Sequence, residues 1–212
     1  LPRGAGDQLP SSDAGAVVAL AERLELLLSI FAKGERPSGS SDPYALRRAG
    51  NGLLQIVWDR GWRLDLSRFL GSAVEDWTAL FPEFAIDSSA LHKDLCQLLR
   101  QRIVSQLEDE GFAPDLVQAV SAESVATERL LADPMDVRER LDLLNALRQS
   151  KALPALMAVV QRAARLAEKG DLAETDLTVS AVVSPERFES PSETAMYEVL
   201  VQLVLDDHVS SH

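Results

Sequence analysis

Apolar residues recur at intervals of three and four along most of this chain, which is the spacing of a single buried helix face. The first stripe predicts a helix over residues 13–31, with Val17, Leu20, Ala21, Leu24, Leu27, Leu28 and Phe31 on its buried side. Similar stripes follow Pro43 and Asp65, and the longest covers residues 88–110 and ends before Gly111. The pattern predicts an all-α fold.

Capping residues and prolines mark where these helices begin. Asp42 followed by Pro43 supplies a cap carboxylate and a residue whose ring presets φ, so a helix is predicted to start at Pro43. Asp65 is expected to cap the third helix, which should stop before Pro82. The pair Asp133-Pro134 repeats the signal of Asp42-Pro43 and predicts another helix start.

Shorter helices are predicted in the second half of the chain, over residues 114–120, 123–132, 134–147 and 153–169. A long connection follows over residues 171–189, and its only strand-like run, Thr178 to Val183, is too short to form a sheet alone. The run Ser190-Pro191-Ser192-Glu193 is a capping box that predicts a final helix.

We interpret these helices as two connected helical bundles. Gly71 marks a bend or a junction within the third helix, and the charge balance changes close to it. Residues 1–72 hold nine Lys and Arg against eight Asp and Glu, a net charge of +1. Residues 73–212 hold the other twelve and twenty-five, a net of −13, so the whole chain carries −12. The expected domains are therefore residues 1–72 and residues 73–212.

The acidic balance argues against a generic nucleic-acid binder, because release of counterions from nucleic acid requires clustered Lys and Arg. A surface that faces phosphates is expected in the first third of the chain, where the balance is slightly basic. The average field of residues 73–212 opposes the approach of RNA, although a local patch or contacts to exposed bases remain open to it.

The sequence offers no catalytic or metal-binding motif. There is no Walker-type loop, Gly-x-Ser-x-Gly elbow, His-Glu-x-x-His or Cys-x-x-Cys. The single cysteine, Cys96, has no partner for a disulfide, and His92 is followed by Lys93 where a metal-binding His-Asp pair would require an aspartate. No apolar run approaches the roughly 20 residues that cross a bilayer. We expect a soluble protein of a reducing compartment.

The run from Lys33 to Arg48, KGERPSGSSDPYALRR, joins the first two predicted helices through a loop rich in Gly and Ser. It places Tyr44, Arg47 and Arg48 in the first turns of a helix, an arrangement that suits contact with phosphate. Arg3, between a proline and a glycine, presents another guanidinium from a loop. The plainer alternative for all of these side chains is solvated surface.

Two motifs in this region resemble those of a known family. The chain opens with LPRGAGDQLP, and KGERPSGSSDPYALRR follows at residues 33–48. They are similar to the patterns LPRGAGDxLP and GxxPxGSxDPFALRR of the beta subunit of the bacterial two-subunit glycyl-tRNA synthetase. QLEDEGFAPDLVQAV, at residues 106–120, resembles the segment that opens the anticodon-binding region of that family, and FESPSETAMYEVL, at residues 188–200, resembles a later acidic helix start.

The resemblance implies a division of labour between two polypeptides. In that family the alpha subunit binds ATP and glycine and forms the adenylate, while the beta subunit recognises tRNA. Residues 1–72 would be the end of a helical domain related to HD phosphohydrolases, and residues 73–212 most of an anticodon-binding domain of the arginyl-tRNA synthetase type, truncated at its C-terminus.

The chain is thus expected to be a non-catalytic C-terminal fragment without a cofactor or metal of its own. It would belong to a cytoplasmic heterotetramer of two alpha and two beta subunits, with tRNA(Gly) as the substrate and no contact with a membrane.

The resemblance also suggests which residues meet tRNA. Candidates in the first third are Arg3, Lys33, Arg36, Arg47 and Arg48. Where the family has a helix of the type Ala-Asn-Lys-Arg-Val-x-Asn-Ile, residues 160–166 keep only Arg162, and Arg165 is placed to replace the missing positive charge.

Three alternatives stay open. Arg47 and Arg48 would have a structural role if they paired with Asp42 or Asp59 and locked the loop. The chain would be a remnant phosphohydrolase if a metal centre existed. It would be an acidic helical scaffold or subunit-interaction module without direct RNA contact if the opening motifs were coincidental.

Overall fold

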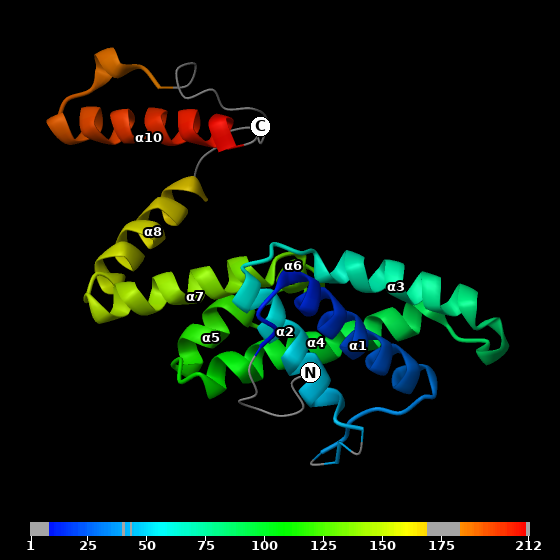
Figure 1. The fold of residues 1–212 in the computed structure, drawn as a ribbon. Coiled ribbons are helices and arrows are strands. Elements are labelled where there is room, and N and C mark those ends of the chain that lie inside the picture. The colour runs from blue at the N-terminus through cyan, green and yellow to red at the C-terminus, as the bar shows by residue number, and fades with distance from the viewer. Residues whose placement is uncertain (1–8, 40, 43, 169–182, 211–212) are drawn as a thin grey trace. The chain divides into compact units, whose positions relative to one another are not determined.

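The computed structural model describes residues 9–39, 41–42, 44–168 and 183–210 (Figure 1). Over these residues the backbone forms α-helices, two short 3-10 turns and one isolated bridge between Ser38 and Ser41, with no strand. The all-α prediction is confirmed. The chain divides into two compact units, one ending at Met157 and the other beginning at Ala158.

Unit 1 contains seven complete α-helices among its described residues. They are α1 (Asp13–Ala32), α2 (Leu46–Arg60), α3 (Leu66–Leu80), α4 (Ser88–Asp109), α5 (Pro114–Ser121), α6 (Thr127–Ala132) and α7 (Pro134–Gln149). The 3-10 turn η1 (Pro82–Phe84) lies between α3 and α4, and α8 (Leu153–Ala167) crosses the division into unit 2. Predicted helix 13–31 is thus confirmed as α1, whereas α6 begins at Thr127, four residues later than expected.

The core of unit 1 is built around α4. Helices α1, α2, α3, α5 and α6 all pack against α4, and α7 packs against α2, α5 and α6 (Figure 1). Apolar side chains from each of these helices, including Leu27, Leu53 and Leu99, form one continuous buried cluster. Burial of such leucines contributes about 1.5–3 kcal/mol each to folding, so this shared core holds the unit together.

The expected domain boundary between residues 72 and 73 falls inside this core. Helix α3 continues through Gly71, and its buried residues Leu70 and Val74 belong to the same cluster as those of α2 and α4. The chain divides at Met157–Ala158 instead. The change in charge balance near residue 72 is therefore a property of the surface, which does not mark where the core ends.

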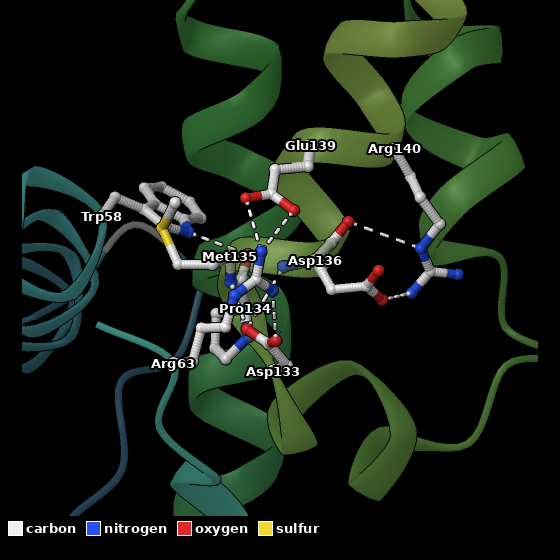
Figure 2. A network of polar contacts seen from close by, with 8 residues as sticks. All are labelled: Trp58, Arg63, Asp133, Pro134, Met135, Asp136, Glu139 and Arg140. Carbon is white, nitrogen blue, oxygen red and sulfur yellow. Dashed lines mark hydrogen bonds and ion pairs between the residues drawn. The ribbon is translucent and has the colours of Figure 1, made fainter. Parts of the chain in front are cut away.

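A polar network ties the turn after α2 to the start of α7 (Figure 2). The indole Nε1 of Trp58 donates a hydrogen bond to the carbonyl oxygen of Pro134 at 3.0 Å. Arg63 donates to Asp133 at 2.8 Å and to both carboxylate oxygens of Glu139 at 2.8 and 2.7 Å, and these bonds raise the pKa of Arg63. Residues more than seventy positions apart are thereby joined across the unit.

Most predicted helix ends are confirmed. The Asp65 carboxylate accepts from the backbone N–H of Arg68 at 2.9 Å and caps α3, and Asp133 accepts from Met135 and Asp136 at the start of α7. Gly111 follows α4 with a φ of +90°, the left-handed region that favours glycine.

Helix α2 begins at Leu46, so the predicted start at Pro43 is wrong. Ala45 precedes the helix in the left-handed conformation, with a φ of +56°, and interrupts the helical path. The Asp42 carboxylate still satisfies the free end, but from further away, because it accepts from the backbone N–H groups of Leu46 at 2.7 Å and Arg47 at 3.0 Å. The cap residue was identified correctly and the start of the helix was placed three residues too early.

Unit 2 contains the later part of α8, the 3-10 turn η2 (Pro185–Arg187) and α10 (Pro191–Ser210). The Glu193 carboxylate accepts from the backbone N–H groups of Ser190 at 2.8 Å and Glu189 at 2.7 Å, which confirms the capping box and lowers the pKa of Glu193. The strand-like run predicted at residues 178–183 lies almost wholly outside the described residues. Among the described residues no helix is long and apolar enough to cross a membrane.

Candidate nucleic-acid interface

The loop between α1 and α2 is shaped by glycines and by short hydrogen bonds. Gly34 and Gly39 adopt φ values of +82° and +52°, which residues with a Cβ rarely reach. The backbone N–H of Ser41 donates to the carbonyl oxygen of Ser38 at 2.8 Å, and Ser38 donates back to Ser41 at 3.1 Å. The loop therefore folds on itself just before the start of α2.

Arg36 anchors this loop to α4. Its Nε and Nη2 donate to Asp94 Oδ2 at 2.9 and 2.7 Å, and its Nη1 donates to the carbonyl oxygens of Phe31 and Glu35 at 2.6 and 2.8 Å. The guanidinium also lies 4.2 Å from the centre of the Phe31 ring. These contacts neutralise the charge of Arg36 and give it an anchoring role, whereas its expected contact with tRNA stays a prediction.

Arg47 holds the same loop from the other side. Its Nη2 donates to the carbonyl oxygen of Gly39 at 2.8 Å and its Nη1 to that of Ser41 at 3.4 Å. The alternative that Arg47 locks the loop is therefore correct in kind, but its partners are backbone carbonyls in place of Asp42 or Asp59. Because carbonyls are uncharged, the positive charge of Arg47 is not cancelled. Its neighbour Arg48 is exposed and has no side-chain partner within the described residues.

Arg102, on α4, is a basic residue near this loop that the sequence analysis did not select. The aliphatic stem of Arg102 lies over Gly50 on α2, where an added Cβ would stand 3.0 Å from Cγ of Arg102. The Nε atom is buried and has no hydrogen-bond partner in the described structure. Burial and then the charge of Arg47 lower the pKa of Arg102, partly offset by Asp109 and Asp42. Two guanidiniums thus converge where α2 begins.

The glycines of α2 explain how arginines reach this place. An added Cβ at Gly52 would stand 2.4 Å from Nε of Arg23, as one at Gly50 would meet Arg102. The close approach expected beside Gly50 and Gly52 is therefore made by arginine side chains. A sequence signal for Arg102 existed, because Leu95, Leu99 and Arg102 fall on one face of α4 and place its stem at the helix contact.

Most other arginines of unit 1 are paired with carboxylates. Ion pairs join Arg36 to Asp94, Arg60 to Asp13 and Asp59, Arg63 to Asp133 and Glu139, Arg138 to Glu110, Arg140 to Asp136, and Arg148 to Asp115. Within the described residues Arg47, Arg48 and Arg102 make no such pair. We call these three residues the α2/α4 arginine cluster.

The comparisons with known proteins identify the family. A model of the glycyl-tRNA synthetase beta subunit matches residues 1–122, which is more than half of the chain. The chain belongs to the glycyl-tRNA synthetase beta subunit family. The match includes the whole α2/α4 arginine cluster.

Curated members of this family match almost the entire chain. The glycine–tRNA ligase beta subunit of a Picosynechococcus species is 41% identical over 206 residues, covering 96% of this chain and 28% of the relative. Those of Trichodesmium erythraeum and Pseudomonas putida are 40% and 31% identical, covering 99% and 95% of this chain and 29% and 27% of the relatives. The chain spans less than a third of the length of these beta subunits.

The other basic residues proposed for tRNA contact are not brought into the cluster. Lys33 is exposed just after α1, and Arg162 and Arg165 are exposed on the part of α8 that belongs to unit 2. No ion pair joins these three side chains to any described carboxylate. Arg3 lies outside the described residues.

His92 was the residue weighed for the phosphohydrolase alternative. Its Nε2 lies 2.8 Å from the carbonyl oxygen of Ser67 and 3.3 Å from Sγ of Cys96, beside a cavity of about 500 Å³ that is also lined by Glu75 and Glu128. In the described part of this beta subunit chain, no three or more His, Cys, Asp or Glu side chains are grouped so that they could hold a metal ion. Burial raises the pKa of the Cys96 thiol, which disfavours the reactive thiolate.

Proposed function

We propose that this chain is part of the tRNA-recognition region of a glycyl-tRNA synthetase beta subunit, supporting the ATP-dependent attachment of glycine to tRNA(Gly). The alpha subunit would bind ATP and glycine and catalyse the reaction, in a cytoplasmic heterotetramer of two alpha and two beta subunits. The observation that carries the proposal is the α2/α4 arginine cluster, which has no carboxylate partners in a chain of net charge −12.

The physical argument is one of charge compensation. Arginine is strongly favoured where phosphate is bound, because its planar fork of N–H donors matches the phosphate oxygens. Two guanidiniums that approach each other repel, and an anion between them relieves that repulsion. The depressed pKa of Arg102 shows that this compensation is incomplete in the protein alone. A phosphate of the RNA backbone would supply it.

The cluster contacts phosphates and does not by itself specify sequence. Reading of the anticodon region by helices after residue 73 remains part of the proposal. Because α1 to α7 share one core, we place any such reading surface on the same unit as the cluster, with residues 1–72 and the rest of the unit acting together.

The experiment uses the full beta subunit and labelled tRNA(Gly). The double variant R48M/R102M removes two charges while its methionines keep the aliphatic stems. Arg47 is left unchanged because it supports the loop. We expect binding to weaken about tenfold, and the dependence of log affinity on log salt to fall by about two, or one per phosphate contact.

The matched control is R129M, because Arg129 is an exposed arginine on α6 that also lacks an ion pair within the described residues. Exchange of pyrophosphate into ATP, which requires only adenylate formation, should be unchanged in all variants. If R48M/R102M binds tRNA(Gly) with the affinity and salt dependence of the unmodified protein, the cluster does not contact RNA. The subunit-scaffold function would then be the better account, with Arg36 and Arg47 serving only the loop.

A further inference from the structure

The connection between α3 and α4 ends in a cluster of aromatic side chains. The Trp77 ring lies 4.8 Å from that of Phe81 and 5.6 Å from that of Phe84, and the last two rings are 6.3 Å apart. Trp77 packs against the core of the unit, but Phe81 and Phe84 remain 40% and 47% exposed and the adjacent Leu80 is 73% exposed. We call Leu80, Phe81 and Phe84 the α3 tip.

The α3 tip is held in a fixed shape. Pro82 occupies the first position of η1, and the N–H groups of Phe84 and Ala85 donate to the carbonyl oxygens of Phe81 and Pro82 at 3.2 and 3.1 Å. Ala85 adopts the left-handed conformation with a φ of +48°, which is unfavourable for a residue with a Cβ. The backbone therefore accepts strain and keeps two phenylalanines in solvent. Strain of this kind is concentrated at functional sites.

The exposed apolar area is large for a single turn. From the exposed fractions of its three side chains, the α3 tip presents roughly 300 Å² of apolar surface, which is the size of the largest patch on a typical monomer. Rigid aromatic side chains are also the residues that contribute most to protein interfaces, because they lose little conformational entropy on binding.

The charges around the tip decide what kind of partner fits. Residues 69–91 include four carboxylates and no Lys or Arg, and all four carboxylates are exposed: Glu75, Asp76, Glu83 and Asp87. A negative rim repels the RNA backbone, so a platform for stacking bases is disfavoured. It favours a protein surface that has an apolar centre and Lys or Arg around it.

We propose that the α3 tip docks on the alpha subunit, at an apolar depression rimmed by basic residues. The inference rests on the assembly with an alpha subunit proposed above, and it is independent of the RNA contacts of the α2/α4 arginine cluster. The tip lies at the end of α3, whereas the arginine cluster lies at the start of α2 and the middle of α4, so one beta subunit can use both surfaces at once.

The first measurement needs no substitution. Hydroxyl-radical footprinting of the full beta subunit, alone and with purified alpha subunit, reports the solvent exposure of Phe81 and Phe84. We expect both to be oxidised in the isolated beta subunit and protected in the complex. Protection already present in the isolated beta subunit would overturn the proposal, because another part of the same polypeptide or a second copy would then cover the tip.

The second measurement is the affinity of the two subunits. The variant L80S/F84S removes apolar surface and keeps Trp77, and its two sites are exposed, so folding should be retained. The control L143S changes a leucine on α7 that is 58% exposed. We expect L80S/F84S to weaken association about tenfold or more, L143S to leave it unchanged, and added salt to weaken the unmodified pair.

The outcomes separate the two proposals. If unmodified subunits do not associate, the proposed assembly fails, and the tip proposal fails with it. If they associate and L80S/F84S binds equally well, only the tip proposal fails. A loss of tRNA(Gly) affinity with unchanged subunit association would show that the tip binds RNA, which also overturns it.

Discussion

Replacement of Trp58 by phenylalanine tests whether the first helices and α7 share one core. Trp58 is only 8% exposed, and its indole donates to the buried carbonyl of Pro134 at 3.0 Å. The Arg138 guanidinium lies 5.2 Å from the centre of the indole ring. The contact joins α2 to α7, which are expected to be in different domains if the chain divides near residue 72 and are in one unit in the structure.

The expected magnitude follows from what W58F removes. Loss of the donor leaves a buried carbonyl unsatisfied, which costs about 1–3 kcal/mol. The smaller ring leaves a partly filled cavity, which adds about 1 kcal/mol. We therefore expect the free energy of unfolding of unit 1 to fall by about 2–4 kcal/mol, with the weaker interaction between Arg138 and the aromatic ring contributing at the upper end.

The assay is urea unfolding followed by tryptophan fluorescence. The chain contains three tryptophans, at positions 58, 62 and 77, and all lie in unit 1, so the signal of the two that remain reports this unit alone. W62F is the matched control, because Trp62 is half-buried and its indole has no hydrogen-bond partner in the described structure. It should cost under about 1 kcal/mol.

Two results would refute the reasoning. A loss below about 1 kcal/mol for W58F, or one equal to that of W62F, would mean that the bond to Pro134 contributes little. Two separate unfolding transitions in the unmodified chain, with Trp62 and Trp77 reporting different midpoints, would show that the helices before and after residue 72 fold as independent domains.

Two further predictions follow from the shifted pKa values of Cys96 and Asp115. Because burial raises the pKa of the Cys96 thiol, iodoacetamide should alkylate the folded chain at least about tenfold more slowly than the urea-unfolded chain at the same pH, and equal rates would contradict the buried position. The hydrogen bond from Arg148 lowers the pKa of Asp115, so the pair stabilises the fold above the ordinary carboxyl pKa of about 3.9 and is lost as pH falls through the lower folded value. NMR titration should find the Asp115 pKa below its usual range, and R148M should return it to about 3.9, whereas an unchanged pKa in R148M would exclude Arg148 as the cause.

Several local features were predictable from the sequence because neighbouring residues determine them. The period of three and four apolar positions predicted α1 and α4 closely, and Asp65, Asp133 and Gly111 marked helix ends correctly. Caps bond to backbone groups two to four positions away, so their chemistry is visible in a short window. The start of α2 failed because Asp42 reaches four and five residues ahead, past a left-handed Ala45 that no local signal announced.

The roles of the arginines could be assigned only with distant partners in view. Arg36 is neutralised by Asp94, which lies 58 positions away, whereas Arg47 bonds to loop carbonyls and keeps its charge. Both belong to one conserved-looking run of letters, and nothing in that run distinguishes them. Arg102 joins Arg47 because α4 crosses α2 at Gly50, a contact between segments about fifty residues apart.

The sequence by itself therefore determined that this protein is helical, where most of its helices end and, through two motifs, which family it resembles. Tertiary structure alone decided that α1 to α7 share one core, and which guanidiniums are cancelled by carboxylates and which remain available to an anion. The physical reason is range: hydrogen bonding and side-chain periodicity act within a few residues, but burial and charge pairing depend on whichever segments the packed helices bring together.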